Sequence, residues 1–599
     1  MREKTLYFLR NNILLLVLLC VFLVLIFYRL DNSYLWKDEA GTANVSYNIM
    51  SQGVPSVYDG KNLLTTTDGN NFNDLLLVSN HDWLQYYICA GSFFLFGKNT
   101  FAARFPFAFF SFVSIVVIWF IAKRIWGQRK CANLACFLYG INVQFLLYAR
   151  QARYYSLSLF FTALSILLVF KLLEIIDNEN TLKQRYGWVS VLLACSVGLL
   201  FFSNRLSGII FVGSLVLYLL YLHKKILFKM LIPVGCGMIP YVGWFIINNI
   251  IFEAPSFGGN AIESHMFSKL LLVVWKLQVY FIPFISLFVI ILAIKFFNFV
   301  LGRRERQIFN DKEYFLFIAL IISNICVTIV PKWGIVNHYY LPVLIATPFI
   351  MVYVLRYIWG SSKTIAVTIL LLIVMTNVLN VFPYELVDEV PDEKNEVNNL
   401  LSENQVWTTN YGIFASPDTD ANFRITPLNS FLSTMTYRSY LFDYFRELQY
   451  GYYSPIQEIV EYVNKQSSPD DTMLVIGMEY EPIIFYTDLR VVNNLSTKFS
   501  PWSDFFPSYP NQEKYEHLTR VSDEEIDWII LKKGMPVDLF FDDPRYLEKS
   551  RDLFDIYESQ TSDIDLSTSA DLDYHKFETV YDGESFTIWH RIKGGMDGS

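Results

Sequence analysis

The first 383 residues contain about eleven long apolar runs, and this feature constrains the fold most. A helix of about 17 to 25 apolar residues matches the hydrocarbon thickness of a bilayer. Runs of this length, or nearly so, cover 12–28, 101–122, 131–148, 154–173, 187–203, 206–222, 226–250, 270–296, 314–331, 339–358 and 364–383. Only 17% of all residues are charged, whereas soluble proteins have about a quarter. The chain is therefore predicted to be a polytopic α-helical membrane protein.

Lysines and arginines in alternate loops predict the orientation of these runs. Short cytoplasmic loops carry an excess of both residue types. The basic loops follow the second, fourth, sixth, eighth and tenth runs, at 123–130, 171–185, 224–229, 303–306 and 356–363. We therefore expect a cytoplasmic N-terminus and, with an odd number of spans, an extracytoplasmic C-terminal part.

One shorter apolar stretch, Trp83 to Phe96, has about 14 residues and is short for a crossing. Counting it as a span would place the basic loop 123–130 outside the cell. We interpret it as a helix lying in the membrane interface within a long outer loop, residues 31–100. A true crossing is the alternative, which would give 12 or 13 spans.

Charge divides the chain into two predicted domains. Residues 1–383 hold 31 basic and 16 acidic residues, whereas residues 384–599 hold 17 basic and 40 acidic ones. The first part is predicted to be the membrane domain and the second a soluble extracytoplasmic domain. Its acidity disfavours nucleic-acid binding, because a phosphate backbone would be repelled.

The acidic part shows helix and strand patterns in alternation, which indicates a small α/β sheet domain. We expect helices at 455–465 and 481–487 and strands at 473–477, 489–492, 527–531 and 586–590. No glycine-rich phosphate loop follows the first strand. The domain is predicted to recognise an acceptor or to shield the site.

Polar residues gather in the predicted outer loops, where ionisable groups at the membrane edge indicate function. Asp38 and Glu39 follow the first run, and His81 and Asp82 precede the stretch at 83–96. Solvated loop carboxylates are the plainer explanation of the first pair. A helix cap, by Asn80 or Asp82, is the plainer explanation of the second.

A second set of polar residues belongs to later outer loops. The segment Tyr148 to Tyr155 contains Gln151 and two arginines, Arg150 and Arg153, against the positive-inside bias. An external anion would explain these arginines, although snorkelling to lipid headgroups is the alternative. Weaker signals of the same kind are Arg205, Lys332 and His338.

A metal site is a further candidate in the loop 251–268. Glu263 and His265 offer a carboxylate and an imidazole two residues apart. Such a pair is a signal of low specificity. Together, the outer loops supply carboxylates that accept a proton and cations that bind an anion, which suits transfer from a lipid phosphate.

The order of these motifs resembles the GT-C glycosyltransferases. The similar branch comprises the protein O-mannosyltransferases, the lipid A aminoarabinose transferases and related bacterial galacturonosyltransferases. The residues that carry the resemblance are Asp38-Glu39, His81 to Tyr86, Ala103 to Pro106, Tyr148 to Tyr155 and His338 to Pro342. Three departures from the family pattern are two missing prolines after His81, glutamine for glutamate at Gln151, and histidine for arginine at His338.

The resemblance implies a sugar donor carried on a polyprenyl monophosphate, such as undecaprenyl or dolichyl phosphate. Asp38 would be the general base that deprotonates the acceptor, with inversion at the anomeric carbon, and Glu39 would orient the acceptor or share a cation. Some relatives carry a divalent metal, which a phosphate leaving group does not strictly require. The implied contacts to substrate or phosphate are His81, Asp82, Gln151, Arg153, Arg205 and His338.

Two other classes of function compete with this interpretation. A transporter or flippase of a lipid-linked or anionic substrate would place charges near mid-membrane and show repeated halves, and neither pattern is clear here. A receptor with an outer ligand-binding domain would not need Asp38, Arg153 or His338. The acceptor, whether lipid, glycan or protein, is not specified by the sequence.

Overall fold

The computed structural model describes most of the helical part and the core of the C-terminal part. The described residues are 2–64, 72–177, 183–251, 270, 273–274, 276–300, 313–329, 337–376, 378–380, 439–450, 455–476, 480–493, 525–532, 577–582 and 586–591. They form two compact units. The predicted domain boundary at 383/384 lies outside the described residues.

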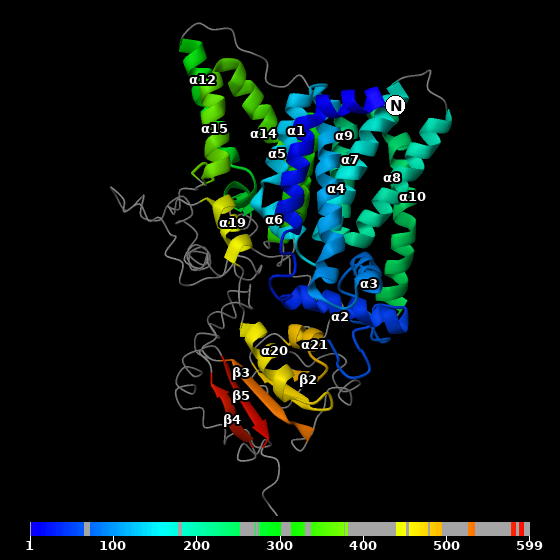
Figure 1. Ribbon diagram of the computed structural model, residues 1–599. Helices are drawn as coiled ribbons and strands as arrows, with labels where there is room; N and C mark the ends of the chain where they lie inside the picture. Colours follow the sequence, from blue (N-terminus) through cyan, green and yellow to red (C-terminus); the bar gives the residue numbers. More distant parts are fainter. Residues whose placement is uncertain are drawn as a thin grey trace, which may run out of the picture. The chain divides into compact units, whose positions relative to one another are not determined.

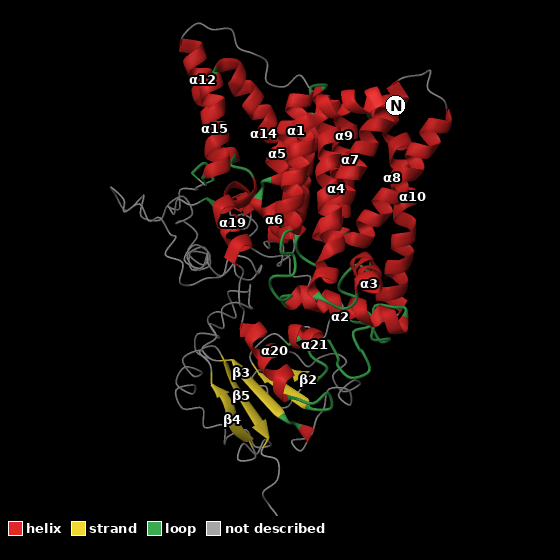
Figure 2. Ribbon diagram, viewed as in Figure 1, coloured by secondary structure: helices red, strands yellow, loops and turns green. Residues whose placement is uncertain are grey.

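The first unit comprises Met1–Asn32, Arg104–Phe245 and Asn260–Tyr452, and its described elements are helical. Figures 1 and 2 show its longer helices packed side by side. They are α1 (Arg2–Phe27), most of α4 (Thr100–Trp126), α5 (Arg129–Gly140), α6 (Val143–Ala149), α7 (Tyr155–Asp177), α8 (Lys183–Ser203), α9 (Arg205–Leu222), η1 (Lys224–Ile226), α10 (Leu227–Phe245), η3 (Leu277–Phe281), α12 (Phe284–Val300), α13 (Tyr314–Thr328), η4 (Asn337–Tyr340), α14 (Leu341–Ser361), α15 (Lys363–Met375) and α19 (Tyr440–Tyr450).

Each of the eleven apolar runs contains a helix or a helix pair, so the predicted polytopic helical fold is confirmed. Among the described residues, six helices are long and apolar enough to cross a membrane, or seven if the bent pair α5 and α6 is one span. Other apolar helices, including α12, α13 and α15, have 10–17 residues. The total of eleven spans stays a prediction.

Two of the apolar runs are continuous in the sequence and form broken helices in the structure. Between α5 and α6 the axis bends by 66°. Asn142 caps the new helix there, because its side chain accepts a hydrogen bond from the Phe145 N–H. The run 270–296 is interrupted at Ile282, whose extended backbone precedes Pro283.

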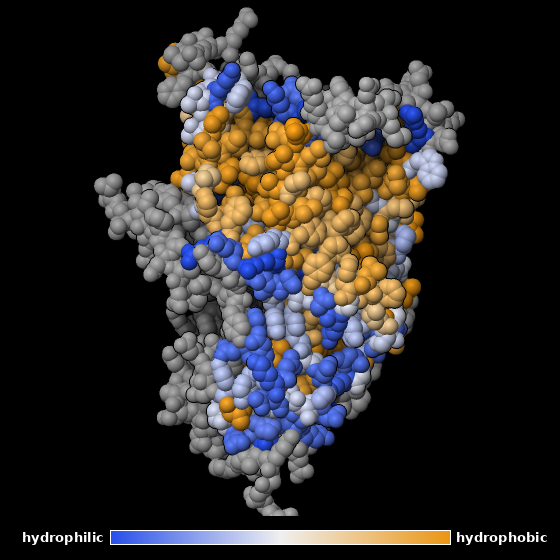
Figure 3. Space-filling view, in the orientation of Figure 1, coloured by the Kyte–Doolittle hydropathy of each residue, from blue (hydrophilic) through white to orange (hydrophobic). Residues whose placement is uncertain are grey.

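Apolar side chains cover the visible face of the helical unit, as Figure 3 shows. Many of the exposed side chains are large and hydrophobic, for example Leu14, Phe120, Trp188, Phe228 and Leu371. In water such a surface would be unfavourable, whereas in lipid it is the expected contact. The unit is therefore a multi-pass membrane domain.

The second unit comprises Ser33–Ala103, Ile246–Gly259 and Tyr453–Ser599, and it is built around a five-stranded sheet. The strand order is β2-β1-β3-β5-β4, parallel from β2 to β3 and antiparallel thereafter. Its elements are α2 (Lys37–Gln52), α3 (Leu84–Phe96), η2 (Ile246–Ile251), α20 (Pro455–Gln466), β1 (Thr472–Ile476), α21 (Glu481–Tyr486), β2 (Arg490–Asn493), β3 (Trp528–Lys532), β4 (Phe577–Asp582) and β5 (Phe586–Arg591). The predicted α/β sheet is confirmed, with β4 as an additional strand.

The described parts of the segment 33–100 share one hydrophobic core with this sheet. Val57 and Phe72 from the loop are fully buried in the same cluster as Met473 and Ile530 from β1 and β3. At the sheet edge, the Asn62 side chain accepts a hydrogen bond of 2.7 Å from the Val491 N–H and donates to the Leu489 carbonyl. The loop is thus an integral part of the sheet unit.

Candidate functional site

The residues predicted from the sequence fall into two groups. Asp38, Glu39, His81 and Asp82 belong to the sheet unit, and Gln151, Arg153, Arg205 and His338 belong to the helical unit. Glu263, His265 and Lys332 lie outside the described residues. Within the described part of the chain, no cluster of three His, Cys, Asp or Glu residues forms a metal site.

The acidic pair lies in the first turn of α2. Glu39 is buried, with an exposed fraction of 1%, and Asp38 is partly exposed. The positive end of the helix dipole stabilises carboxylates at this position. The Thr42 hydroxyl donates to the Asp38 carbonyl at 2.9 Å, which holds the turn that carries both side chains.

Tyr486, at the end of α21, holds the chain segment that leads into α2. Its ring stacks on Tyr34 with centroids 3.9 Å apart, and its hydroxyl accepts a hydrogen bond of 2.9 Å from the Leu35 N–H. The Thr100 hydroxyl lies 2.6 Å from the same oxygen. Burial, and secondarily the charge of Glu461, raises the pKa of Tyr34 above its ordinary value. The Tyr34 phenol therefore remains neutral, and the segment that leads into α2 is held in place.

His81 and Asp82 precede α3. The N-cap residue of this helix is Trp83, so neither Asn80 nor Asp82 occupies the cap position. The Trp83 indole instead donates to the Val78 carbonyl at 2.8 Å. Asp82 is 5% exposed and His81 is partly buried. Both stay candidates for substrate contact.

The two arginines of the segment 148–155 have different surroundings. Arg150 donates to the carbonyls of Ile26, Tyr28 and Arg29 at 2.8 to 2.9 Å, and more weakly to that of Leu25. Leu25 and Ile26 lie in the last turn of α1, where carbonyls lack the usual helical partner, and Tyr28 and Arg29 follow the helix. Arg150 is therefore a structural cap of α1.

Arg153 belongs to a cluster of aromatic rings that joins two distant segments. Its guanidinium lies 5.4 Å from the centroid of the Tyr154 ring. The Tyr155 ring stacks on His338 at 5.5 Å, and the Tyr154 ring meets His338 edge-on at 6.4 Å. Arg153 is only 5% exposed. The structure thus brings together a buried cation and an imidazole that are separated by 185 positions in the sequence.

Gln151 lies between the two arginines and is 2% exposed. Neither its amide nitrogen nor its amide oxygen has a hydrogen-bond partner among the described residues. A buried amide without partners costs free energy, and a bound molecule or ordered water relieves that cost. This residue is therefore a candidate ligand contact on geometric grounds as well as by motif.

Arg205 follows the cap of α9. The Asn204 side chain accepts a hydrogen bond from the Ser207 N–H, so this asparagine has a structural function. The Arg205 guanidinium lies 5.6 Å from the Phe245 ring centroid. Its role in substrate binding stays a prediction.

Lys276 is a buried cation that we did not single out in the sequence. Its exposed fraction is 2%, in the turn that enters η3. The sequence does indicate this residue, because burying a charged lysine of the apolar run 270–296 in a membrane costs free energy. Arg104 was also not assigned a role, and it donates to the Leu30 carbonyl at 3.0 Å.

Comparison with known proteins gives partial sequence matches and a matching fold. The family model for dolichyl-phosphate-mannose-protein mannosyltransferase matches residues 80–246. A curated relative, undecaprenyl phosphate-alpha-4-amino-4-deoxy-L-arabinose arabinosyl transferase 2 of Pseudomonas fluorescens (strain Pf0-1), is 29% identical over 113 residues. That segment covers 19% of this chain and 20% of the relative.

Solved structures of ArnT from Cupriavidus metallidurans have a similar fold. The form bound to undecaprenyl phosphate has a TM-score of 0.55 and 14% identity, covering 97% of this chain and 98% of that one. The apo form has a TM-score of 0.53 and 13% identity, covering 96% and 98%. At this level of identity the likeness concerns the fold.

Proposed function

We propose that this chain is a GT-C glycosyltransferase that transfers one sugar from a polyprenyl monophosphate to an extracytoplasmic acceptor. The matched relative uses an undecaprenyl phosphate-linked sugar by its name, and ArnT was solved with undecaprenyl phosphate. The acceptor class comprises lipids, glycans and proteins. We assign the N-terminus to the cytoplasm and the C-terminal part, from residue 384, to the outer side.

The observation that best supports this proposal is the cluster of Arg153, Tyr155 and His338 in a membrane unit. A cation held at low exposure among aromatic rings is expensive in hydrocarbon, and binding an anion offsets that cost. A polyprenyl glycosyl phosphate carries one negative charge at its phosphate, and its polyprenyl chain is apolar. The cluster supplies the matching positive charge.

Arg153 and His338 are assigned to the departing phosphate. Negative charge grows on the phosphate as the glycosidic bond breaks, so fixed cations stabilise the transition state more than the ground state. Gln151 is assigned to a hydroxyl or phosphate oxygen of the donor, because its amide offers both a donor and an acceptor. Arg205 is assigned to a supporting contact with the donor.

Asp38 is assigned as the general base. A carboxylate in the first turn of α2 accepts the proton of the acceptor hydroxyl as that oxygen attacks the anomeric carbon. A single displacement of this kind inverts the anomeric configuration. Glu39, His81 and Asp82 are assigned to orienting the acceptor, and Glu263 and His265 stay candidates for a metal.

The experiment is a donor screen with purified protein in lipid nanodiscs. Radiolabelled sugars on polyprenyl phosphate are supplied one at a time, and release of the polyprenyl phosphate is measured beside Arg153→Ala. The proposal predicts release from one donor and a loss of about 10²- to 10³-fold in the variant. Failure to consume any donor, together with label crossing proteoliposome membranes on intact lipid, would instead support a transporter.

A further inference from the structure

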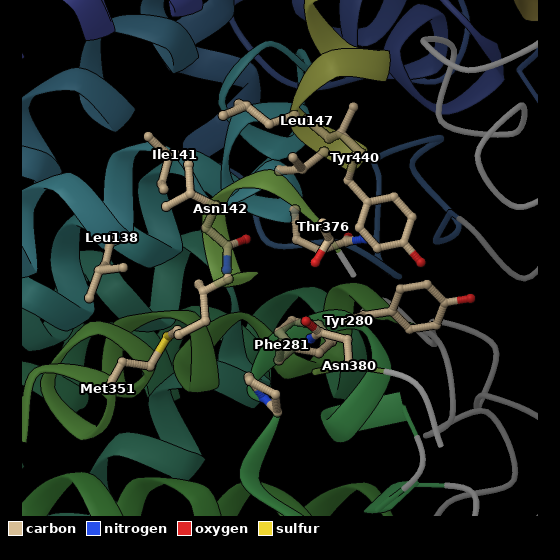
Figure 4. A pocket seen from close by; sticks show the side chains of 16 residues that line it. Leu138, Ile141, Asn142, Leu147, Tyr280, Phe281, Met351, Thr376, Asn380 and Tyr440 are labelled. Carbon is tan, nitrogen blue, oxygen red and sulfur yellow. The ribbon is translucent and has the colours of Figure 1, made fainter. Parts of the chain in front are cut away.

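A cavity within the helical unit is not explained by the donor contacts described above. The space between its walls amounts to about 950 Å³, a figure that includes open solvent. Figure 4 shows it from close by. Its wall is formed by the ends of α5 and α6, the turn from η3 to α12, α14, the end of α15 and the start of α19.

Interruptions of several helices converge on this cavity. Ile141 and Asn142 separate α5 from α6, Pro283 follows η3, and Thr376 ends α15, and all four residues line the cavity. Non-helical backbone at membrane depth is tolerated where it is buried in protein or faces a polar cavity. In secondary transporters, discontinuous helices of this kind form the substrate sites.

The lining of the cavity is amphipathic and uncharged. Among the described lining residues there is no Asp, Glu, Lys, Arg or His. Apolar side chains such as Leu138 and Met351 lie on one side in Figure 4, and the rings of Tyr280 and Tyr440 lie on the other, with both hydroxyls pointing the same way. Gln144 is a further polar residue of the wall. The side chains of Asn142, Thr376 and Asn380 also line it, and each forms a hydrogen bond to the backbone, with the Phe145 N–H, the Leu372 carbonyl and the Gln278 carbonyl, respectively.

This chemistry selects one kind of occupant. A phosphate or carboxylate would be left without a countercharge, which is costly in such surroundings. Amide and hydroxyl groups hydrogen-bond to hydroxyls, and phenol rings pack on the apolar faces of sugar rings. The apolar side of the wall accommodates hydrocarbon. The best match is an uncharged glycan attached to a lipid chain.

The cavity adjoins the segments that carry the donor contacts. Leu147 lines the cavity, and the motif segment begins at the next residue, Tyr148. On the other wall, the lining residue Phe281 packs against the ring of Tyr340 at 5.7 Å, two positions after His338. A molecule in the cavity therefore lies beside the segments that hold Arg153 and His338.

We propose that this cavity binds the acceptor, and that the acceptor is a lipid bearing an uncharged glycan. The assignment of the bound lipid as the acceptor rests on the proposed transferase function. The binding of a neutral glycolipid rests on the cavity alone. It predicts selectivity against anionic lipids, because no cation lines the wall within the described residues.

The experiment uses the full chain in nanodiscs with a synthetic diglucosyl diacylglycerol that carries a photoreactive diazirine on the glycan. We expect cross-links in peptides containing Tyr280 or Tyr440, competed by unlabelled diglucosyl lipid and not by phosphatidylglycerol. Tyr440→Ala and Gln144→Leu should each reduce the yield about fivefold, as expected for loss of about 1 kcal/mol. The control is Phe442→Ala, an exposed residue of the same helix that does not line the cavity.

Three outcomes overturn the inference: cross-links elsewhere on the chain, equal competition by phosphatidylglycerol, or an unchanged yield in both cavity variants. The donor screen is independent of this measurement. Cross-linking at the cavity without turnover of any donor would leave the neutral glycolipid site standing and reject the transferase function. Turnover of a donor without cross-linking at the cavity would support the transferase function and reject the neutral glycolipid site.

Discussion

The imidazole of His338 stacks on the phenol ring of Tyr155, with centroids 5.5 Å apart and planes 27° from parallel. This contact fixes the segment after α13 against the start of α7. It places an ionisable ring beside Arg153, whose guanidinium faces the neighbouring Tyr154. The rings of Tyr154 and Tyr155 therefore link Arg153 to His338.

Donor affinity should fall when the nitrogens of His338 are removed. Both imidazole nitrogens can hydrogen-bond to a phosphate oxygen or to water, whereas a phenyl ring cannot. His338→Phe keeps a ring against Tyr155 and loses these nitrogens, so we expect weaker donor binding. Equilibrium binding of a polyprenyl-phosphate sugar measures this without the catalytic steps. Wild-type affinity in His338→Phe would remove His338 from the phosphate contacts.

Truncation of Arg150 and of Arg153 should have different effects on stability and on donor binding. Arg150→Ala leaves the carbonyls at the end of α1 without their partner, so we expect a loss of stability of about 1–3 kcal/mol and a lower unfolding temperature in detergent. Arg153→Ala should weaken donor binding, which Arg150→Ala should leave nearly unchanged in the folded protein. Equal effects of both variants on stability and on binding would contradict this division.

Tyr486→Phe should weaken the support of α2 without removing the ring stack on Tyr34. The variant loses the acceptor of the Leu35 N–H, which is worth about 1 kcal/mol. We expect a reduced turnover number with little change in donor affinity, because the residue acts through the position of Asp38. Tyr486→Ala loses the stack as well and should be more severe. If Tyr486→Phe changes donor affinity and turnover to the same degree, a general structural defect is the better explanation.

A close helix contact gives a sharp test of the packing between α8 and α10. A Cβ atom at Gly237 would lie 2.2 Å from the Ala194 carbonyl oxygen, whereas one at Gly235 would meet nothing within 4 Å. Backbone cannot yield as a side chain does, so Gly237→Ala should destabilise the protein by about 1–3 kcal/mol. Gly235→Ala is the matched control on the same helix. Thermal unfolding in detergent compares the two, and equal unfolding temperatures would refute the contact.

Hydropathy predicted the helical part of the fold well, because the thickness of the bilayer fixes the length of a span. It did not predict the bend between α5 and α6. A helix break is hard to recognise in the sequence when a single asparagine cap such as Asn142 accepts a hydrogen bond from the free backbone N–H of the new helix. The cavity that lies at these breaks was therefore invisible in the sequence.

The candidate site was predicted as residue types and not as an arrangement. Motif order identified Arg153 and His338, and their shared contact with Tyr154 depends on long-range packing that no local pattern encodes. The structural role of Arg150 was missed for the same reason, since its partners lie more than 120 positions away. The sheet was recognised from its strands, whereas its shared core with Val57 and Phe72 was not.

Asp38 as the general base is the central assignment of the proposed mechanism, and one comparison of variants tests it directly. Asp38→Asn is measured beside Asp31→Asn, an exposed carboxylate in the same stretch of chain. With a donor that the wild type consumes, we predict that Asp38→Asn lowers the rate of sugar transfer by about 10²- to 10⁴-fold and leaves donor affinity within twofold, whereas Asp31→Asn changes neither. Transfer at the wild-type rate by Asp38→Asn would contradict the assignment.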